Sequence, residues 1–287
     1  MRLDDALAQA TTHLANHDVE SPQLDAELLL SHLLGTNRAA ILARPEQQLP
    51  PELLTRYRNL VARRGDHEPL AYILGYREFY GLELVVDPRV LIPRPETELL
   101  VEHTLKIASQ MAYPPRIADV GAGSGAIAVS LAVHLPQCTV YALDNSPDAL
   151  EVVTENALRH GVTGRVHCLH SDLLAALPGP VDIITANLPY VATDEWQELP
   201  PEIRAHEPRS ALDGGSDGLA LIERLLTTAE PNLRLGGAIL LEIGAGQGIG
   251  TTTLARRYLP QTRVRLVQDY AGLDRLVIIE TQTPSAT

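Results

Sequence analysis

Near its middle the chain reads Arg116-Ile117-Ala118-Asp119-Val120-Gly121-Ala122-Gly123-Ser124-Gly125. A short, mainly apolar run leads into three glycines at alternate positions, and a helix-length apolar segment begins at Ala126. Strand, glycine-rich turn and helix in this order open a doubly wound α/β sheet, which binds ligands at the carboxyl ends of its strands. We therefore expect an α/β domain with a binding crevice beside Gly121.

Strand-length and helix-length segments alternate on both sides of this unit. The expected elements are Arg116–Val120, Ala126–His134, Thr139–Leu143, Ala149–His160, Val166–Leu169, Asp182–Ala186, a helix at Leu219–Ala229 and strands at Ala238–Ile243, Val264–Val267 and Leu276–Glu280. Apolar strands separated by helices are typical of a mostly parallel sheet that is covered on both faces. Only Thr281–Thr287 looks like a loose tail.

The first part of the chain has a different pattern. Residues 1–75 show helical periodicity, with Ser21-Pro22 as a helix start, Gly35 as a helix stop and a further helix from Pro51 to Arg64. Residues 76–92 are rich in aromatic and β-branched residues around Gly81 and predict a hairpin linker. We expect a helical domain at 1–75, the linker at 76–92 and the α/β domain at 93–287.

Composition limits the classes of partner. The 287 residues carry 23 Lys and Arg against 36 Asp and Glu, and the resulting net charge of −13 argues against nucleic acid as the direct substrate. Cys138 and Cys168 lack CxxC spacing, so we expect no disulfide framework and no zinc site. The acidic start and the absence of an apolar run of about 20 residues predict a cytoplasmic protein without a membrane span. We expect a monomer.

The glycine segment is a candidate cofactor site. Gly121-Ala122-Gly123-Ser124-Gly125 lacks the third glycine of the dinucleotide fingerprint, so a pyrophosphate cofactor is the weaker interpretation. Asp144 ends the next strand about 20 residues further on, where an acid accepts both hydroxyls of an adenosine ribose. Loop and acid together predict an adenosine-containing cofactor.

Asp172 and Leu173 follow the third expected strand. Asp172 is placed either to accept from an adenine amino group or to cap a helix over the next five residues, and Leu173 is placed to pack on the ring. A second glycine pattern, Gly244-Ala245-Gly246-Gln247-Gly248, follows a later strand. We expect that pattern to lie away from the crevice and to bind no second cofactor.

The tetrapeptide Asn187-Leu188-Pro189-Tyr190 follows the fourth expected strand, at the same sheet edge as the glycines. The Asn187 side-chain oxygen and the Leu188 carbonyl are suited to accept two N–H groups of a planar nitrogen, and Tyr190 offers a flat aromatic face. Pro189 biases Leu188 toward an extended backbone that aims its carbonyl outward. A simple strand-ending turn is the alternative.

The chain resembles the peptide chain release factor glutamine methyltransferases of the HemK type over nearly its whole length. The resemblance is carried by the glycine segment and by Glu68–Gly75, Arg77–Gly81, Leu91–Glu98, Glu207–Gly215 and Asp269–Arg275. It implies a Rossmann-like fold and methyl transfer from S-adenosyl-L-methionine, with S-adenosyl-L-homocysteine as product, to the glutamine of the Gly-Gly-Gln motif in release factors. By position, Gly121–Gly125, Asp144 and Asn187 would bind the donor, and Asn187–Tyr190 the glutamine.

One residue departs from that family. Leu188 stands where the family usually has proline, and Asn-Leu-Pro-Tyr also resembles the ribosomal RNA adenine dimethyltransferases. An N6-adenine methyltransferase acting on RNA or DNA is therefore the alternative function, and a catalytically silent assembly factor that docks through the helical domain is a third hypothesis.

Four further features leave alternatives open. Phe79, the one phenylalanine, is a candidate wall of the glutamine pocket or a core contact. Arg94, between two prolines, either approaches the donor carboxylate or fixes its loop by an ion pair. Trp196 either covers the site or touches a protein substrate. His167, Cys168 and His170 alternate in direction along one expected strand, so we expect no metal there.

Overall fold

The structure is a computed structural model that describes residues 1–281. Of the tail expected at Thr281–Thr287, Thr281 belongs to the last strand and residues 282–287 lie outside the described part. The chain forms two compact units. One contains Met1–Tyr76 together with Pro200–His206, and the other contains Arg77–Leu199 and the chain from Glu207 onward.

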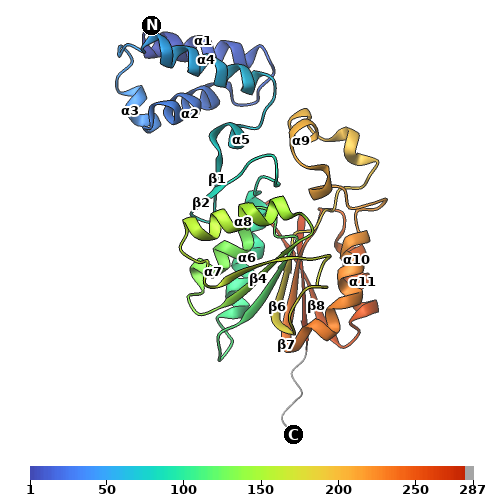
Figure 1. Ribbon diagram of the computed structural model, residues 1–287. Helices are drawn as coiled ribbons and strands as arrows, with labels where there is room; N and C mark the ends of the chain where they lie inside the picture. The colour runs from blue at the N-terminus through green and yellow to red at the C-terminus, as the bar shows by residue number, and fades with distance from the viewer. Residues whose placement is uncertain (282–287) are drawn as a thin grey trace. The chain divides into compact units, whose positions relative to one another are not determined.

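The first unit is helical (Figure 1). Its helices are α1 (Leu3–Ala15), α2 (Pro22–Leu34), α3 (Arg38–Leu42), α4 (Pro51–Gly65), α5 (Leu70–Leu74) and α9 (Pro201–His206). The start of α2 at Pro22 and its stop at Gly35 are as predicted, because glycine adopts the left-handed φ of +60° at low cost.

A buried ion-pair network joins α9 to the rest of this unit. The guanidinium of Arg64 donates to Asp25 at 2.7 Å and to Glu202 at 2.9 Å, and its side chain is 9% exposed. Buried charges of this kind require pairing, since an isolated ion is costly to desolvate. Although α9 is distant in sequence, it therefore belongs to the helical unit.

The second unit opens with a hairpin of β1 (Tyr76–Phe79) and β2 (Leu82–Val85), in which Gly81 takes a φ of +73°. A short 3₁₀ turn, η1 (Pro95–Thr97), then leads into α6 (Glu98–Ala108). The predicted hairpin is thus present.

A seven-stranded sheet forms the centre of this unit. Its strands are β3 (Arg116–Val120), β4 (Thr139–Asp144), β5 (Val166–His170), β6 (Val181–Ala186), β7 (Leu233–Glu242), β8 (Thr262–Gln268) and β9 (Asp274–Thr281). They lie in the order β5-β4-β3-β6-β7-β9-β8, and β9 runs antiparallel to the strands on either side of it, β7 and β8. The chain turns from one side of β3 to the other after β5, so β3 and β6 flank the switch point where such sheets bind ligands. The expected Rossmann-like, mostly parallel sheet is confirmed.

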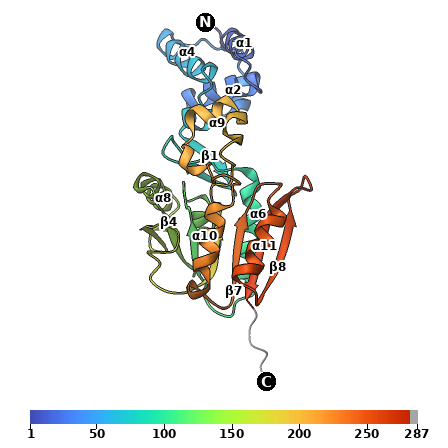
Figure 2. The ribbon, with the colours of Figure 1, turned by 90° about the vertical axis from the view of Figure 1, so that its right-hand side faces the viewer.

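Helices cover both faces of the sheet (Figures 1 and 2). One face packs on α6, α7 (Ala126–His134) and α8 (Pro147–Arg159), and the other on α10 (Ala220–Ala229) and α11 (Gly248–Tyr258). Adjacent strand residues divide between the two cores: Ile117, Ile183 and Leu240 join the first, and Ala118, Ile184 and Ile239 the second. This division follows from the two-residue period of a strand.

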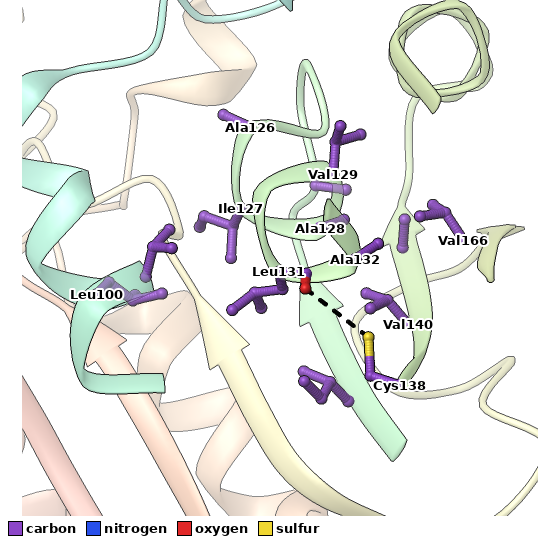
Figure 3. Close-up of a cluster of buried hydrophobic side chains, with 14 of the residues drawn as sticks. Leu100, Ala126, Ile127, Ala128, Val129, Leu131, Ala132, Cys138, Val140 and Val166 are labelled. Atoms are coloured by element: carbon purple, nitrogen blue, oxygen red, sulfur yellow. Dashed lines mark hydrogen bonds between the residues drawn. The ribbon is translucent and has the colours of Figure 1, made fainter. Parts of the chain in front are cut away.

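Figure 3 shows part of the first core, where α7 packs against β4. Every residue from Ala126 to Ala132 is buried, which is why this helix shows no polar stripe. The Cys138 thiol points to the Leu131 carbonyl at 3.9 Å, and burial raises its pKa. Cys138 is therefore a core residue held as a neutral thiol.

Short 3₁₀ turns complete the second unit at η2 (Glu195–Glu198), η3 (Arg209–Ala211) and η4 (Glu230–Asn232). The helix that was one of the two alternatives for the residues after Asp172 does not form. Residues 173–176 are instead a turn, in which Leu173 takes a φ of +50°. Within residues 1–281, no helix has the length and apolar character that crossing a membrane requires.

Candidate active site

The glycine segment leaves β3 at Val120 and is held at the end of β4. The backbone N–H groups of Gly121 and Ala122 donate to the Leu143 carbonyl at 2.8 and 3.0 Å. Gly121, Gly123 and Gly125 take φ values of +75°, +54° and +78°, a region that side chains disfavour. The three glycines are therefore required by the shape of the turn.

Asp144, at the end of β4, faces this turn. Its Oδ2 accepts from the Gly123 N–H and its Oδ1 from the Ser146 N–H, both at 2.9 Å. A carboxylate oxygen has two lone pairs, so each oxygen retains one for a ligand hydroxyl. The glycine turn and the acid that sequence spacing paired with it are thus in direct contact.

A cavity of about 390 Å³ opens beside the turn. It is lined by most of the residues proposed from sequence, which are Gly121, Ala122, Gly123, Ser124, Asp144, Asp172, Leu173, Asn187, Leu188 and Pro189. This volume lies within the range of small-molecule sites, roughly 300 to 1,000 Å³. The size of the cavity and the free acceptor positions of Asp144 fit an adenosine-containing ligand.

Asp172 and Leu173 lie further along the sequence than the glycine turn and also line this cavity. Asp172 accepts from the Arg224 guanidinium at 2.6 Å, with both side chains more than half exposed. The Ser171 hydroxyl, not Asp172, caps the following turn by accepting from the Ala176 N–H. The helix-cap interpretation of Asp172 is therefore wrong.

The acceptor tetrapeptide leaves β6 and passes through a cradle of glycines. A Cβ atom on Gly214 would lie 2.5 Å from the Pro189 carbonyl oxygen, and one on Gly218 would collide with the Tyr190 carbonyl oxygen. The Val191 N–H and carbonyl also pair with Leu212 and Gly214. The backbone of the tetrapeptide is therefore held closely by its neighbours beside the cavity.

The second glycine pattern lies against this tetrapeptide. The Gln247 side chain accepts from the Gly244 N–H at 2.9 Å and donates to the Tyr190 carbonyl at 2.8 Å. The loop therefore contacts the tetrapeptide, although it lies outside the crevice, as expected. The Gln247 side chain occupies the inside of the loop by bonding to the Gly244 N–H. None of the loop residues lines the cavity.

Leu188 links the acceptor tetrapeptide to the glycine turn. Its side chain is 4% exposed, and its Cδ2 lies 3.2 Å from where a Cβ on Gly121 would stand. Among the described residues, no hydrogen bond reaches the Leu188 carbonyl or the Asn187 Oδ1 atom. Two acceptors are thus available beside the cavity.

Tyr190 is partly buried behind the cavity, and burial raises its pKa to about 12. The phenol is therefore neutral at physiological pH. Tyr190 is not among the residues that line the cavity, and its Cδ2 atom lies 3.5 Å from where a Cβ on Gly244 would stand.

Phe79 does not line the cavity either. Its side chain is 1% exposed and belongs to the hydrophobic core of α6, α7 and α8. The assignment of Phe79 to a glutamine pocket is therefore corrected to a core contact, which is the position that a lone large aromatic side chain favours when no polar group accompanies it.

Arg94 makes the ion pair that the sequence suggested. It donates to the buried carboxylate of Glu207 at 2.5 Å, and the other oxygen of that carboxylate accepts from the Ile92 N–H at 3.1 Å. Glu207 thereby fixes the segment before α6. Trp196 is 9% exposed, and the Arg209 guanidinium carbon lies over its ring, 5.0 Å from the ring centre.

Two buried carboxyl groups beneath the site were missed in the sequence. Asp119 accepts from the Ala128 N–H at 3.0 Å and the Thr185 hydroxyl at 3.2 Å, and burial raises its pKa to about 7. Burial also raises the pKa of Glu242, at the end of β7, to about 7. An acid inside an apolar strand was the available signal for both.

Two family models match the chain. The PrmC N-terminal domain matches residues 5–75, and the methyltransferase small domain matches residues 95–202. The boundary between the matches falls in the β1–β2 segment and the loop after it.

Curated relatives match almost end to end. A release factor glutamine methyltransferase of Moorella thermoacetica is 44% identical over 96% of this chain and 97% of its own. One of Geobacter sulfurreducens is also 44% identical, over 92% of each chain.

Solved structures share the fold at low identity. A methyltransferase of Pyrococcus furiosus has a TM-score of 0.54 at 17% identity and covers 78% of this chain and 99% of its own. A 16S rRNA methyltransferase of T. thermophilus, in complex with AdoMet and guanosine, has a TM-score of 0.51 at 18% identity over 72% of this chain and 50% of its own.

Proposed function

The chain belongs to the release factor glutamine methyltransferase family, and we propose that its cavity transfers a methyl group from S-adenosyl-L-methionine to the side-chain amide nitrogen (N5) of the glutamine in the Gly-Gly-Gln motif of release factors. Family membership gives the enzyme class, the cofactor and the release factor substrate. The residues of the cavity give the arrangement by which the transfer occurs.

The donor half of the cavity is formed by the glycine turn and Asp144. The two free acceptor positions of Asp144 would hold the ribose hydroxyls, and the turn allows close backbone approach to the rest of the donor. Asp172 and Leu173 would receive the adenine amino group and ring. When bound there, S-adenosylmethionine supplies an electrophilic methyl carbon on a positively charged sulfur.

The acceptor half carries the proposal. Asn187 Oδ1 and the Leu188 carbonyl are unengaged by the described residues and belong to residues that line the cavity shared with the glycine turn. Each would accept one N–H of the glutamine amide. An amide nitrogen is a weak nucleophile because its lone pair is delocalised, and two fixed acceptors orient it and favour the positive charge that develops as the N–C bond forms. The S–CH₃ bond breaks at the same time, its electron pair returns to sulfur and S-adenosyl-L-homocysteine leaves, and the nitrogen then releases one proton to solvent.

Leu188 is compatible with this scheme. The acceptor at this position is a backbone carbonyl, which leucine and proline share, while the leucine side chain packs against Gly121. This packing contact explains the presence of a leucine at position 188 without any role in nucleic-acid binding. The net charge of −13 also weighs against a polyanionic substrate.

The domain roles and the setting are further parts of the proposal. Residues 1–75 would dock the release factor, 76–92 would link, and 93–287 would carry out the transfer, which agrees with a PrmC N-terminal domain match that ends at residue 75. We propose that the enzyme acts as a monomer in the cytoplasm, with no nucleic acid as direct substrate.

Substrate identity is tested by incubating the protein and S-adenosylmethionine with a release factor, with total RNA and with genomic DNA in parallel. Tandem mass spectrometry then locates the added methyl group. The proposal expects it on the Gly-Gly-Gln glutamine side chain and on no adenine. A methyl group on N6 of adenine, with none on the release factor, would establish the alternative function.

A further inference from the structure

Glu242 lies directly beneath the acceptor tetrapeptide. It is the last residue of β7, and Ala186 of β6 pairs with Leu241 of β7, so the next residues, Asn187 and Glu242, leave the same sheet edge together. Glu242 is 2% exposed. Neither of its carboxyl oxygens has a hydrogen-bonding partner in good geometry within residues 1–281.

Two polar side chains face this carboxyl group. The Thr97 hydroxyl and the Asn187 amide each lower the pKa of Glu242, although burial outweighs them, and neither donates a hydrogen bond to it in the structure. The charged and titratable groups around it are Arg275, Glu96 and Tyr190. Arg275 is engaged elsewhere, since it donates to Asp269 at 3.2 Å and to the Ile243 carbonyl at 3.3 Å. Thr97 and Asn187 are therefore the side chains that could donate a hydrogen bond to the Glu242 carboxylate.

The Thr97 hydroxyl can accept one hydrogen bond and donate another, so it is suited to link Asn187 with Glu242. Its oxygen accepts from Asn187 Nδ2 at 3.1 Å, which leaves its single hydrogen free for another acceptor. Thr97 is 4% exposed, so this hydrogen has no bulk water to satisfy it. Glu242 is a neighbouring buried acceptor without a partner, so its carboxylate would complete a chain from the Asn187 N–H through the Thr97 O–H.

The direction of this chain matters for the Asn187 amide. Rotated by half a turn, the amide would present its oxygen to Thr97 and take the threonine hydrogen, which would leave the buried carboxylate without a donor. The same rotation would point an N–H group at the substrate amide, which needs an acceptor there. An ionised Glu242 therefore selects the one orientation that suits the reaction.

We propose that Glu242 is a positioning residue, which acts through Thr97 to hold the Asn187 amide with Nδ2 toward the protein and Oδ1 toward the glutamine. This inference rests on the proposed function. Glu242 touches neither the donor nor the glutamine and is not itself a catalytic residue.

The test is steady-state methylation of a release factor by wild type, Glu242→Gln, Thr97→Val and the double variant across pH 6 to 9. Glutamine has nearly the shape of glutamate and lacks the charge, and valine has the shape of threonine without the hydroxyl. We expect kcat to fall about 10- to 100-fold in each single variant, the size of a lost charged hydrogen bond, with donor affinity unchanged. The double variant should lose little more, because both changes break one chain.

The pH profile separates positioning from structural support. Wild-type kcat should rise as Glu242 ionises near pH 7, and this rise should be absent in Glu242→Gln, while Asp119 titrates in both proteins. Thr97→Ser, which keeps the hydroxyl, should restore activity to near the wild-type value.

Two results would overturn the inference: a wild-type pH profile and kcat in Glu242→Gln, or additive losses in the double variant. If Glu242→Gln does not fold, Thr97→Val against Thr97→Ser decides, since equal kcat values in these two exclude a relay through the hydroxyl. Absence of glutamine methylation by the wild-type protein would refute the proposed function instead.

Discussion

The Asn187 side chain donates to the Thr97 hydroxyl over 3.1 Å, although the two residues are 90 positions apart in the chain. Asn187 follows β6, and Thr97 ends the short turn before α6. The contact ties the acceptor tetrapeptide to the Arg94–Glu207 ion pair, because Arg94 precedes the same turn. The segment before α6 therefore supports the tetrapeptide through the hydrogen bond between Thr97 and Asn187.

Asp144→Ala should weaken donor binding selectively. The change removes the proposed ribose acceptor and the partner of the Gly123 N–H, so we expect the Kd for S-adenosylmethionine to rise about 10- to 100-fold, the cost of one or two charged hydrogen bonds. Isothermal titration calorimetry measures this directly. Glu151→Ala, an exposed acid on α8, is the matched control and should bind as wild type does. Equal affinities in the two variants would remove Asp144 from the donor site.

Gly218→Ala should displace the tetrapeptide. A Cβ there meets the Tyr190 carbonyl oxygen, and the φ of +71° adds backbone strain of about 1 to 3 kcal/mol. We expect a lower Tm and a kcat that falls at least about tenfold, since small misplacements of positioning groups cost large factors in rate. Gly246→Ala, whose Cβ would meet nothing within 4 Å, should leave both quantities nearly unchanged. Similar behaviour of the two variants would show that the cradle does not position the site.

Leu188→Pro should keep the substrate specificity. The carbonyl acceptor is retained, so methylation of the release factor should persist, while loss of the buried leucine side chain should cost roughly 1.5 to 3 kcal/mol of stability at most. Urea unfolding and mass spectrometry test the two halves of this prediction. Adenine methylation by wild type that disappears in Leu188→Pro would instead make Leu188 a determinant of nucleic-acid specificity.

The two buried carboxyl groups predict how stability depends on pH. Unfolded Asp and Glu ionise near pH 4, whereas burial raises the pKa of both Asp119 and Glu242 to about 7 in the folded protein. Between these values the folded state binds more protons, so each group makes the free energy of unfolding fall by up to about 1.4 kcal/mol per pH unit as pH rises. The loss is complete above about pH 7.

Because other acids also titrate, the informative quantity is the difference in unfolding free energy between wild type and Asp119→Asn, measured by urea unfolding from pH 5 to 8. The advantage of wild type over the variant should shrink as pH rises. An advantage that grows with pH would mean that Asp119 is ionised in the folded protein well below pH 7.

Local patterns were sufficient to predict that the glycine turn, Asp144 and Asn187 lie at one cavity. The φ values of Gly121, Gly123 and Gly125 are properties of a short turn, and Asp144 stands at a fixed strand position relative to it, so sequence spacing carries the information. The same holds for the start of α2 at Pro22 and its end at Gly35.

The supporting residues were not predictable in this way. Thr97, Glu242 and Gln247 reach the tetrapeptide from the segment before α6, from β7 and from the loop after β7, and no local pattern specifies such tertiary neighbours. Phe79 was misassigned because a lone aromatic residue near a site has the same sequence signature whether it lines a pocket or fills a core. The grouping of α9 with the helical unit involves an ion pair between residues far apart in the sequence, Arg64 and Glu202.

The central claim is that Asn187 grips the glutamine amide, and the single-turnover rate constant of Asn187→Ala on a release factor at saturating S-adenosylmethionine tests it most directly. Saturation removes any effect of Asn187 on donor affinity. The account predicts a rate at least about 100-fold below wild type, as for the loss of one preorganised group that stabilises developing charge. A rate within a few-fold of wild type, from a folded variant that still methylates the Gly-Gly-Gln glutamine, would contradict it.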